Sequence, residues 1–173
     1  KKIFVDYFNS IEKIEISKGY TGYFRQFLED INIEKLFAGY WETYVKQIPA
    51  QCFDKANENF FRTTFYELCT RYLSRNFIFN VEVNYPSGRS DWELLGKYHT
   101  KYKNLKYIIE FKHFSKEKAK KQKIKELEKP FEADVIQVTN YAHDIVKDFP
   151  EYNISKFIIY TISAETYRIF TVE

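Results

Sequence analysis

Apolar residues recur along this chain with two periods, and the change of period separates helices from strands. Between residues 57 and 75, large apolar side chains recur at steps of three and four, the spacing of one buried helical stripe. That stripe consists of Phe61, Phe65, Leu68 and Tyr72. Residues 132–148 repeat the pattern with Val135, Val138, Ala142 and Ile145. Both segments are predicted to be amphipathic helices.

Between and after these helices the period is that of strands. Residues 77–85 alternate, which predicts a strand with its odd-numbered residues facing the core: Phe77, Phe79, Val81, Val83 and Tyr85. A turn at 86–88 leads into a second strand, about 89–99, and a turn at 101–104 leads into a third, 106–113. Two further strands are predicted at residues 156–162 and 167–172.

The resulting order is helix, three strands, helix, strand, strand. A meander followed by a crossover helix predicts an α/β fold with a mixed central sheet flanked by helices. Residues 1–50 are predicted to form short helices, one following Asn9 and Ser10 and broken by Gly19–Gly22, with Pro49 as the end. We therefore expect a helical segment or connector at 1–50 and the main domain at 51–173.

Composition limits the functional classes. The 173 residues include 17 Phe and 15 Tyr, so the core is expected to be built on aromatic rings. Two cysteines, Cys52 and Cys69, do not make a disulfide framework, which favours a reducing, cytoplasmic location. No apolar run is long enough to span a membrane. The chain begins with Lys-Lys and lacks Met, which suggests a piece of a longer protein.

Positive charge is concentrated in one segment. Residues 115–129 hold seven lysines and three glutamates, so this segment is more basic than the whole chain, whose net charge is +3. A lysine-rich helix is expected here. Two interpretations stay open: a solvated helix face, or a surface that contacts phosphates through Lys118, Lys121 and Lys125.

The candidate chemistry lies on the second and third strands. Asp91 lies near the start of one strand, and Glu110 and Lys112 lie two apart in the other, so their side chains share a face. An apolar strand normally excludes such charges. A buried structural ion pair is one explanation. The other is a hard divalent cation held by the two acids, with the lysine beside it, an arrangement suited to phosphodiester hydrolysis.

Asp91 followed by Glu110-x-Lys112 after an apolar run resembles the PD-(D/E)xK nuclease superfamily, and the resemblance covers roughly residues 57 to 173. The Gly-Arg-Ser-Asp lead-in at 88–91 resembles a branch found at the C-terminal end of bacterial proteins that begin with a predicted AAA-type ATPase domain. Ser90 stands where the motif's proline is often found. The resemblance implies a restriction-endonuclease-like core and a phosphodiesterase that depends on Mg²⁺ or Mn²⁺.

The resemblance also implies roles for individual residues. Asp91 and Glu110, with the backbone carbonyl of Phe111, would hold the metal, and Lys112 would orient the attacking water and stabilise the transition state. Glu58 and Gln137 would tune the site from the two flanking helices. An equally weighted interpretation is that Glu58 is only a charge at the N-terminus of a helix, stabilised by the helix dipole.

Nucleic-acid contacts are expected from Arg89, the three lysines named above and Tyr141, which shares a helix face with Gln137. A polar helix flank with no role is the other interpretation of Tyr141. The function that follows is a metal-dependent nuclease, most readily on DNA. The alternative is a catalytically silent module that binds nucleic acid or docks an attached ATPase. The sequence does not distinguish DNA from RNA, an endonuclease from an exonuclease, or one oligomeric state from another.

Overall fold

The computed structural model describes residues 16–49, 53 and 57–173, which belong to two compact units, residues 1–52 and 53–173. The first unit contains helix α2 (Ile16–Asp30), helix α3 (Ile33–Thr43) and the 3₁₀ turn η1 (Val45–Gln47). Asn32 caps α3, because its side chain accepts a hydrogen bond from the Lys35 N–H. Asn9 and Ser10, the predicted start of a helix, lie outside the described residues.

The predicted break at Gly19–Gly22 is wrong, since both glycines lie inside α2. A glycine inside a helix costs about 1 kcal/mol, and burial of Phe24 and Phe27 further along the same helix outweighs that cost. The aromatic residues of α3 are buried, as a packing face requires; they are Phe37, Tyr40 and Trp41.

The second unit has the predicted order of elements. Helix α4 (Glu58–Leu73) precedes strands β1 (Phe77–Tyr85), β2 (Gly88–Gly96) and β3 (Leu105–Phe114). The crossover consists of α5 (Lys116–Lys121), the 3₁₀ turn η3 (Ile124–Glu126) and α6 (Glu132–Asp148), and strands β4 (Asn153–Ile162) and β5 (Thr166–Val172) complete the sheet.

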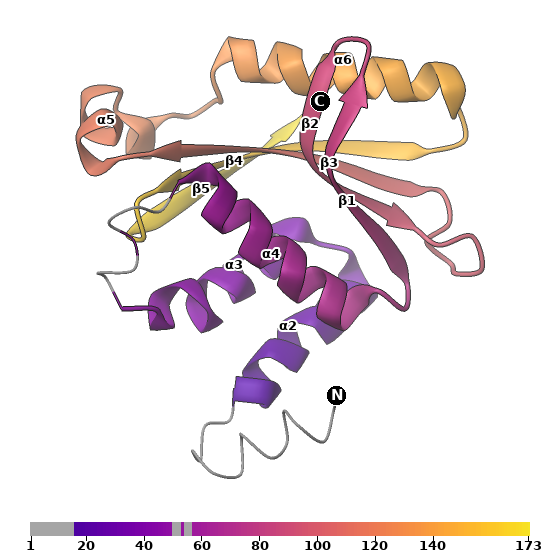
Figure 1. Ribbon diagram of the computed structural model, residues 1–173, viewed down its shortest axis with the longest axis horizontal. Coiled ribbons are helices and arrows are strands. Elements are labelled where there is room, and N and C mark those ends of the chain that lie inside the picture. The colour runs from indigo at the N-terminus through magenta and orange to yellow at the C-terminus, as the bar shows by residue number, and fades with distance from the viewer. Residues whose placement is uncertain (1–15, 50–52, 54–56) are drawn as a thin grey trace. The chain divides into compact units, whose positions relative to one another are not determined.

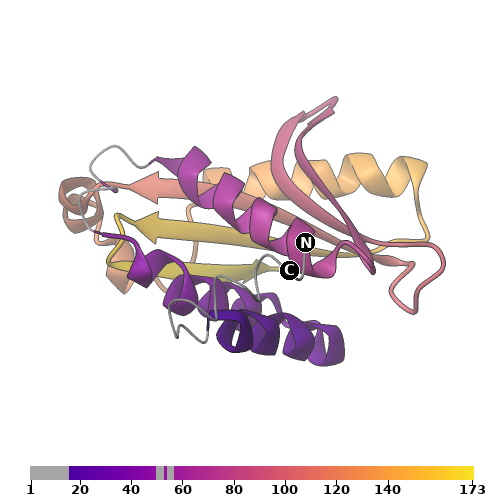
Figure 2. The ribbon, with the colours of Figure 1, turned by 60° about the horizontal axis from the view of Figure 1, so that its bottom comes forward.

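The five strands lie side by side in sequence order, with β3 and β4 parallel and the other neighbours antiparallel. The α/β class and the mixed sheet are therefore confirmed. Helix α4 covers one face of the sheet and α6 the other (Figures 1 and 2). On the α4 face, the Phe65 ring packs against Trp92 and Phe111. On the α6 face, Ile108 and Ile158 share a core with the helix.

The lysine-rich segment is not one helix. Helix α5 ends at Lys121, Lys123 adopts the left-handed conformation with φ 50°, and η3 follows. The buried residues of this segment, Ala119 and Ile124, are five apart. A straight helix does not bring positions five apart onto one face, so the turn at Lys123 allows both to be buried.

Strand β1 also departs from its predicted pattern. Val81 is 41% exposed, whereas alternation places it in the core. The cause lies at Glu82, whose φ of 55° is in the left-handed region and interrupts the extended backbone. The ladder between β1 and β2 passes over Glu82 and Asp91 at this point. The hairpin then curves away from the rest of the sheet (Figure 2).

This curvature opens the sheet at one place. The β2–β3 ladder runs from Leu95 and Lys106 to Trp92 and Ile109, whereas β3 continues alongside β4 to its end at Phe114. Strand β2 therefore parts from β3 just beyond Trp92, where the next residues are Asp91 on one strand and Glu110 on the other. Among the helices of the described residues, none is long and apolar enough to cross a membrane.

Candidate active site

Glu110 lies where β2 and β3 part, and its carboxyl group is incompletely satisfied. Its Oε1 accepts hydrogen bonds from Lys112 Nζ at 2.7 Å and from Gln137 Nε2 at 2.8 Å. Its Oε2 is buried and receives no hydrogen bond from the described residues. Burial, followed by the negative charge of Asp91, raises the pKa of Glu110 to about 7, against the lowering effect of Lys112.

Asp91 is held at both of its oxygens. Oδ1 accepts from Arg62 Nη1 at 2.9 Å, and Oδ2 accepts from the backbone N–H of Phe111 at 2.8 Å. The carboxylate thus binds β3 at the place where the ladder has ended. Each oxygen has a second lone pair, so these bonds orient Asp91 and leave room for a further partner.

Arg62 is a residue of this site that the sequence reasoning missed. It is buried in α4, and its Nη2 donates to Asn59 Oδ1 at 2.5 Å and to Glu82 Oε1 at 2.7 Å. The strained backbone at Glu82 thus coincides with a bond to the arginine that holds Asp91. The available signal was position: Arg62 follows Glu58 by four residues and so lies on the same side of the helix.

Glu58 is the first residue of α4, and Asn57 before it is the cap, accepting from the Phe60 N–H. Burial, and then the charge of Asp91, raises the pKa of Glu58. A carboxylate at a helix N-terminus normally gains from the dipole. Here burial and a neighbouring acid outweigh that gain, which places Glu58 in the electrostatic surroundings of Asp91 and Lys112.

Lys112 remains a cation in this setting. Burial by itself lowers its pKa, but the hydrogen bond to Glu110 and the charge of that carboxylate more than compensate, so the pKa of Lys112 is raised above its usual value. Its side chain is 28% exposed, whereas that of Glu110 is almost fully buried. The ammonium group is therefore the accessible part of the pair.

Gln137 and Tyr141 connect α6 to both strands. The Gln137 amide donates to Glu110 and also to the Tyr141 hydroxyl at 2.7 Å, and that hydroxyl donates to the Arg89 carbonyl at 2.8 Å. Gly88 has φ 146°, and a Cβ there would lie 3.2 Å from the Tyr141 ring. Tyr141 is 2% exposed, so its contact with nucleic acid would require this network to open.

A second buried carboxylate–lysine pair joins β2 to β3, and sequence reasoning missed it too. Lys106 Nζ is 3.0 Å from Glu93 Oε2, and both side chains are almost fully buried. Glu93 Oε1 accepts from the Tyr85 hydroxyl at 2.5 Å and from Ser90 Oγ at 2.7 Å. The signal was available, because the argument that apolar strands exclude charges applies equally to Glu93 and Lys106.

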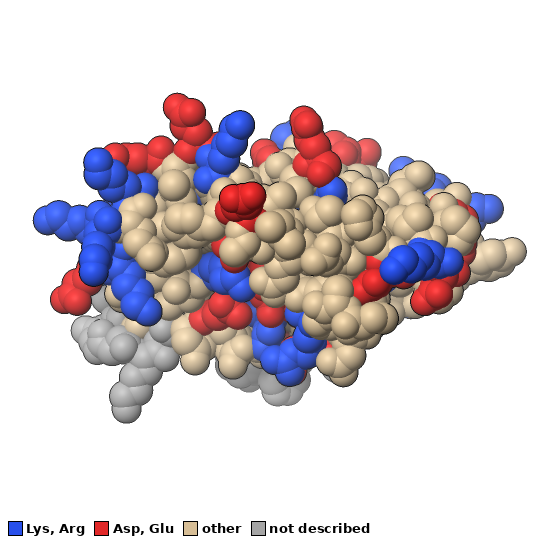
Figure 3. Space-filling view, turned by 90° about the horizontal axis from the view of Figure 1, so that it is seen from above, with Lys and Arg blue, Asp and Glu red and all other residues tan. Residues whose placement is uncertain are grey.

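Of the predicted nucleic-acid contacts, the three lysines follow the end of β3, whereas Arg89 is at the start of β2. Lys118 and Lys121 line a cavity of about 330 Å³ together with His113 and Phe114. Lys125 lines another pocket and forms an ion pair with Glu165. Arg89 is exposed, 3.4 Å from Glu82 Oε2. Lys and Arg side chains gather on the left of Figure 3, the side on which α5 lies in Figure 1.

The donor set at the strand opening fits a hard cation in part. Within the described residues, no three His, Cys, Asp or Glu side chains form a group able to hold a metal ion. Glu110 nevertheless offers a buried oxygen without a donor, next to a second carboxylate. Mg²⁺ binds commonly through one or two carboxylates and completes its shell with water and substrate oxygens.

A mixed sheet with a helix on each face, and an Asp and a Glu-x-Lys set where two of its strands part, define a restriction-endonuclease-like fold. The family model described as the PD-(D/E)XK nuclease superfamily matches residues 56–171. The chain belongs to this superfamily. Comparison with curated proteins and comparison with solved structures each gave no significant match.

Proposed function

We propose that the second unit is a metal-dependent nuclease that hydrolyses phosphodiester bonds in DNA. One observation carries the proposal: within the part of the chain that the structure describes, nothing donates to the buried Glu110 Oε2 beside Asp91, while Oε1 accepts from a protonated lysine. An unsatisfied buried polar group costs about 1–3 kcal/mol. Such a cost is tolerated at a binding site, because the bound ligand satisfies the polar group.

Asp91 and Glu110 would hold Mg²⁺ or Mn²⁺, with the Phe111 carbonyl and Glu58 as further oxygen donors. When bound, the ion supplies a Lewis acid that activates water and neutralises charge on the phosphate. Arg62 keeps Asp91 in place, and Gln137 does the same for Glu110. The two acids therefore need little reorganisation to receive the ion.

Lys112 would act on the substrate. Because it is protonated, it serves as a positive charge and hydrogen-bond donor toward the attacking water and the phosphate oxygens, and not as a general base. Its accessible ammonium lies at the mouth of the site, where the scissile phosphate would be.

DNA would be bound by the basic end of the domain, through Arg89, Lys118, Lys121 and Lys125, with Tyr141 bordering the site. Lys118 and Lys121 line a cavity shared with His113 and Phe114, one and two residues beyond Lys112. An ATPase domain preceding residue 1 would be the partner on the same polypeptide, and a cytoplasmic location would suit both.

A second candidate function is a catalytically silent module that binds nucleic acid or docks such an ATPase. The observation that favours it is the occupation of both Asp91 oxygens, by Arg62 and by the Phe111 N–H. In a silent module the Arg62 guanidinium would be the permanent counter-ion of Asp91, in place of a metal ion.

A cleavage assay tests the proposal. Supercoiled plasmid and single-stranded DNA are incubated with the chain in Mg²⁺, Mn²⁺ or EDTA. We expect cleavage with either ion, none in EDTA, and loss in Glu110→Gln. Glu67→Gln is the matched control, because Glu67 is exposed and pairs only with Arg71 among the described contacts. DNA binding without cleavage in any ion would favour the silent module.

A further inference from the structure

A basic pocket of about 300 Å³ lies between α5, η3 and the turn that joins β4 to β5. Ala119 and Ile162 line its apolar part, and its charged lining is dominated by Lys116, Lys120, Lys123 and Lys125. The pocket is distinct from the opening between β2 and β3, since it lies beyond the end of β3.

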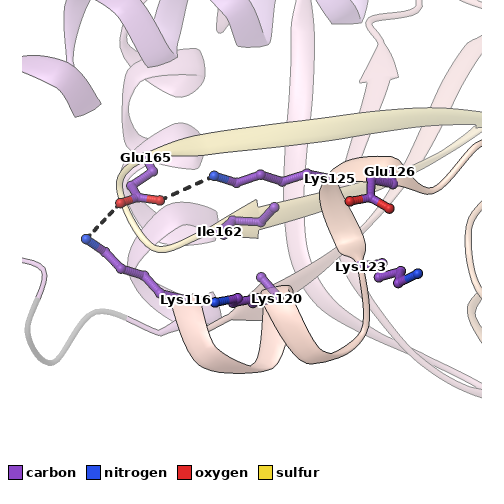
Figure 4. Close-up of a pocket in the computed structure, with 8 residues that line it drawn as sticks. Lys116, Lys120, Lys123, Lys125, Glu126, Ile162 and Glu165 are labelled. Atoms are coloured by element: carbon purple, nitrogen blue, oxygen red, sulfur yellow. Dashed lines mark hydrogen bonds and ion pairs between the residues drawn. The ribbon is translucent and has the colours of Figure 1, made fainter.

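An internal carboxylate bridges two of these lysines. Glu165, in the β4–β5 turn, is 2.8 Å from Lys116 Nζ and 3.5 Å from Lys125 Nζ, one lysine at each oxygen. The two ammonium groups approach Glu165 from different elements (Figure 4). The hydrogen bond from Lys116 is the main cause of a lowered pKa at Glu165. The bridge is therefore ionic at neutral pH.

The backbone that carries these side chains is fixed. The Arg168 guanidinium donates to the carbonyls of Lys125 at 2.8 Å and of Leu127 at 2.7 Å, which holds η3 against β5. The Ser163 N–H donates to the Phe114 carbonyl at 3.0 Å, which holds the β4–β5 turn against the end of β3. The pocket is thus preorganised, and only its side chains need to move.

The bridge itself is weak, because all three side chains are exposed to solvent. Exposed ion pairs contribute little free energy, so another anion can replace Glu165 at small cost. A phosphodiester carries one negative charge, as the carboxylate does, and lysine binds phosphate as a point charge. The occupant that this chemistry fits is a phosphate group.

We propose that this pocket is a second phosphate-binding site for the nucleic-acid strand, and that Glu165 is its internal competitor. Lys116 and Lys125 contact the phosphate once Glu165 has released them. That the strand is DNA rests on the proposed nuclease function. Because Lys116 follows Lys112 by four residues, a strand bound at the cleavage site passes close to this pocket.

The test compares two charge-matched variants of the whole chain. Binding of a short fluorescein-labelled single-stranded DNA is measured by anisotropy in EDTA, where no cleavage occurs. Removing one negative charge a few ångströms from a phosphate should tighten binding roughly threefold to tenfold in Glu165→Gln. The salt dependence should steepen by roughly 0.7 log unit per additional lysine contact. Glu67→Gln is the control, because Glu67 is exposed on α4, does not line this pocket and, like Glu165, pairs with a basic residue.

Equal tightening in both variants would overturn the site, because net charge alone would explain it, and so would no change in Glu165→Gln. Adding Lys116→Gln and Lys125→Gln to Glu165→Gln should return affinity to the parent value or below. Inorganic phosphate is titrated as a competitor: reversal at low millimolar concentration would identify a free-anion site and overturn the strand assignment. A chain that never cleaves, yet gains affinity through Glu165→Gln alone, would refute the nuclease and leave the pocket standing.

Discussion

Two buried carboxylate–lysine pairs, both on the α6 face of the sheet, differ in how completely they are satisfied. Glu93 Oε1 accepts hydrogen bonds from Tyr85 and Ser90, and its Oε2, which has no well-directed hydrogen bond from a described residue, lies 3.0 Å from the Lys106 ammonium. The rings of Tyr85 and Tyr152 lie 5.9 and 5.8 Å from that ammonium. Glu110 has two donors at Oε1 and, among the residues that the structure describes, none at Oε2. The same residue types thus make a closed pair and an open one.

Position in the sheet explains the difference. Glu93 lies within the β2–β3 ladder, opposite Ile108, so neighbouring strands enclose it. Glu110 lies one step beyond the ladder, where only β4 continues alongside β3. The closed pair stabilises the strand that carries Asp91, and the open pair is left for a ligand. The comparison therefore predicts that replacing lysine by methionine affects stability at Lys106 and cleavage at Lys112.

The largest effect is expected from Lys106→Met. It leaves Glu93 buried without its cation, which should cost about 3–5 kcal/mol of unfolding free energy. Urea denaturation measures this cost. Adding Glu93→Leu should recover much of it, because removing both partners of a buried pair is often nearly neutral. A loss below about 1 kcal/mol in the single variant would mean that the closed pair is not structural.

The fold could be predicted from the sequence because hydrophobic periodicity reports burial directly. The apolar stripe predicts the helix at residues 132–148 and the alternation predicts the strand at 77–85, both with the bounds that α6 and β1 have in the structure. Val81 is exposed against the predicted alternation, because the left-handed residue Glu82 follows it and interrupts the extended backbone. Hydrophobic periodicity does not reveal a left-handed residue when that residue is not glycine.

The candidate site could be predicted from the sequence only in part, for a different reason. Asp91, Glu110 and Lys112 were proposed from their spacing, and the structure brings Gln137 to Glu110 as well. Arg62 was missed because its acidic partners, Glu82 and Asp91, are 20 and 29 residues away, so that only its position four residues after Glu58 marks it in the sequence. The sequence does not show which of the two carboxylates is left open, because where β2 parts from β3 depends on tertiary structure.

A pH effect of up to about 3 kcal/mol is expected in the metal-free protein, from a pKa of about 7 for folded Glu110 against 4.5 ordinarily. Between these values the folded state keeps a proton that the unfolded state has lost. Stability should therefore fall as pH rises from about 4.5 to about 7, and then level off. Glu58 shifts in the same direction, and burial lowers the pKa of His113, which acts oppositely.

Comparing the parent with Glu110→Gln isolates the contribution of Glu110, since those other groups are common to both chains. Denaturation midpoints in EDTA across this pH range give the measurement, with Glu67→Gln as the charge-matched control. A parent and a Glu110→Gln variant with the same pH profile would contradict a raised pKa at the open pair.

Lys112→Met should reduce cleavage by roughly 10²-fold or more, because its charge acts on groups that develop at the transition state. Stability should change by less than about 1 kcal/mol, since Glu110 can take up a proton when its cation is lost. Single-turnover cleavage and urea denaturation are measured on the same variant. If Lys112→Met is as unstable as Lys106→Met, both pairs are structural and the contrast between them fails.

The smallest effect concerns the ion itself. At ten times its dissociation constant, Mg²⁺ or Mn²⁺ should stabilise the parent by roughly 1.4 kcal/mol, because it binds the folded state alone. Glu110→Gln should lose this gain, because the oxygen that receives no hydrogen bond in the parent no longer carries charge. Glu93→Gln should keep it despite a lower starting stability, since the closed pair has no part in binding the ion. Thermal melts with each ion, and with EDTA as the reference, provide the measurement. If both Glu110→Gln and Glu93→Gln lose the stabilisation by the ion, the loss reflects general destabilisation of the variants. If both keep it, the ion binds away from the place where β2 parts from β3.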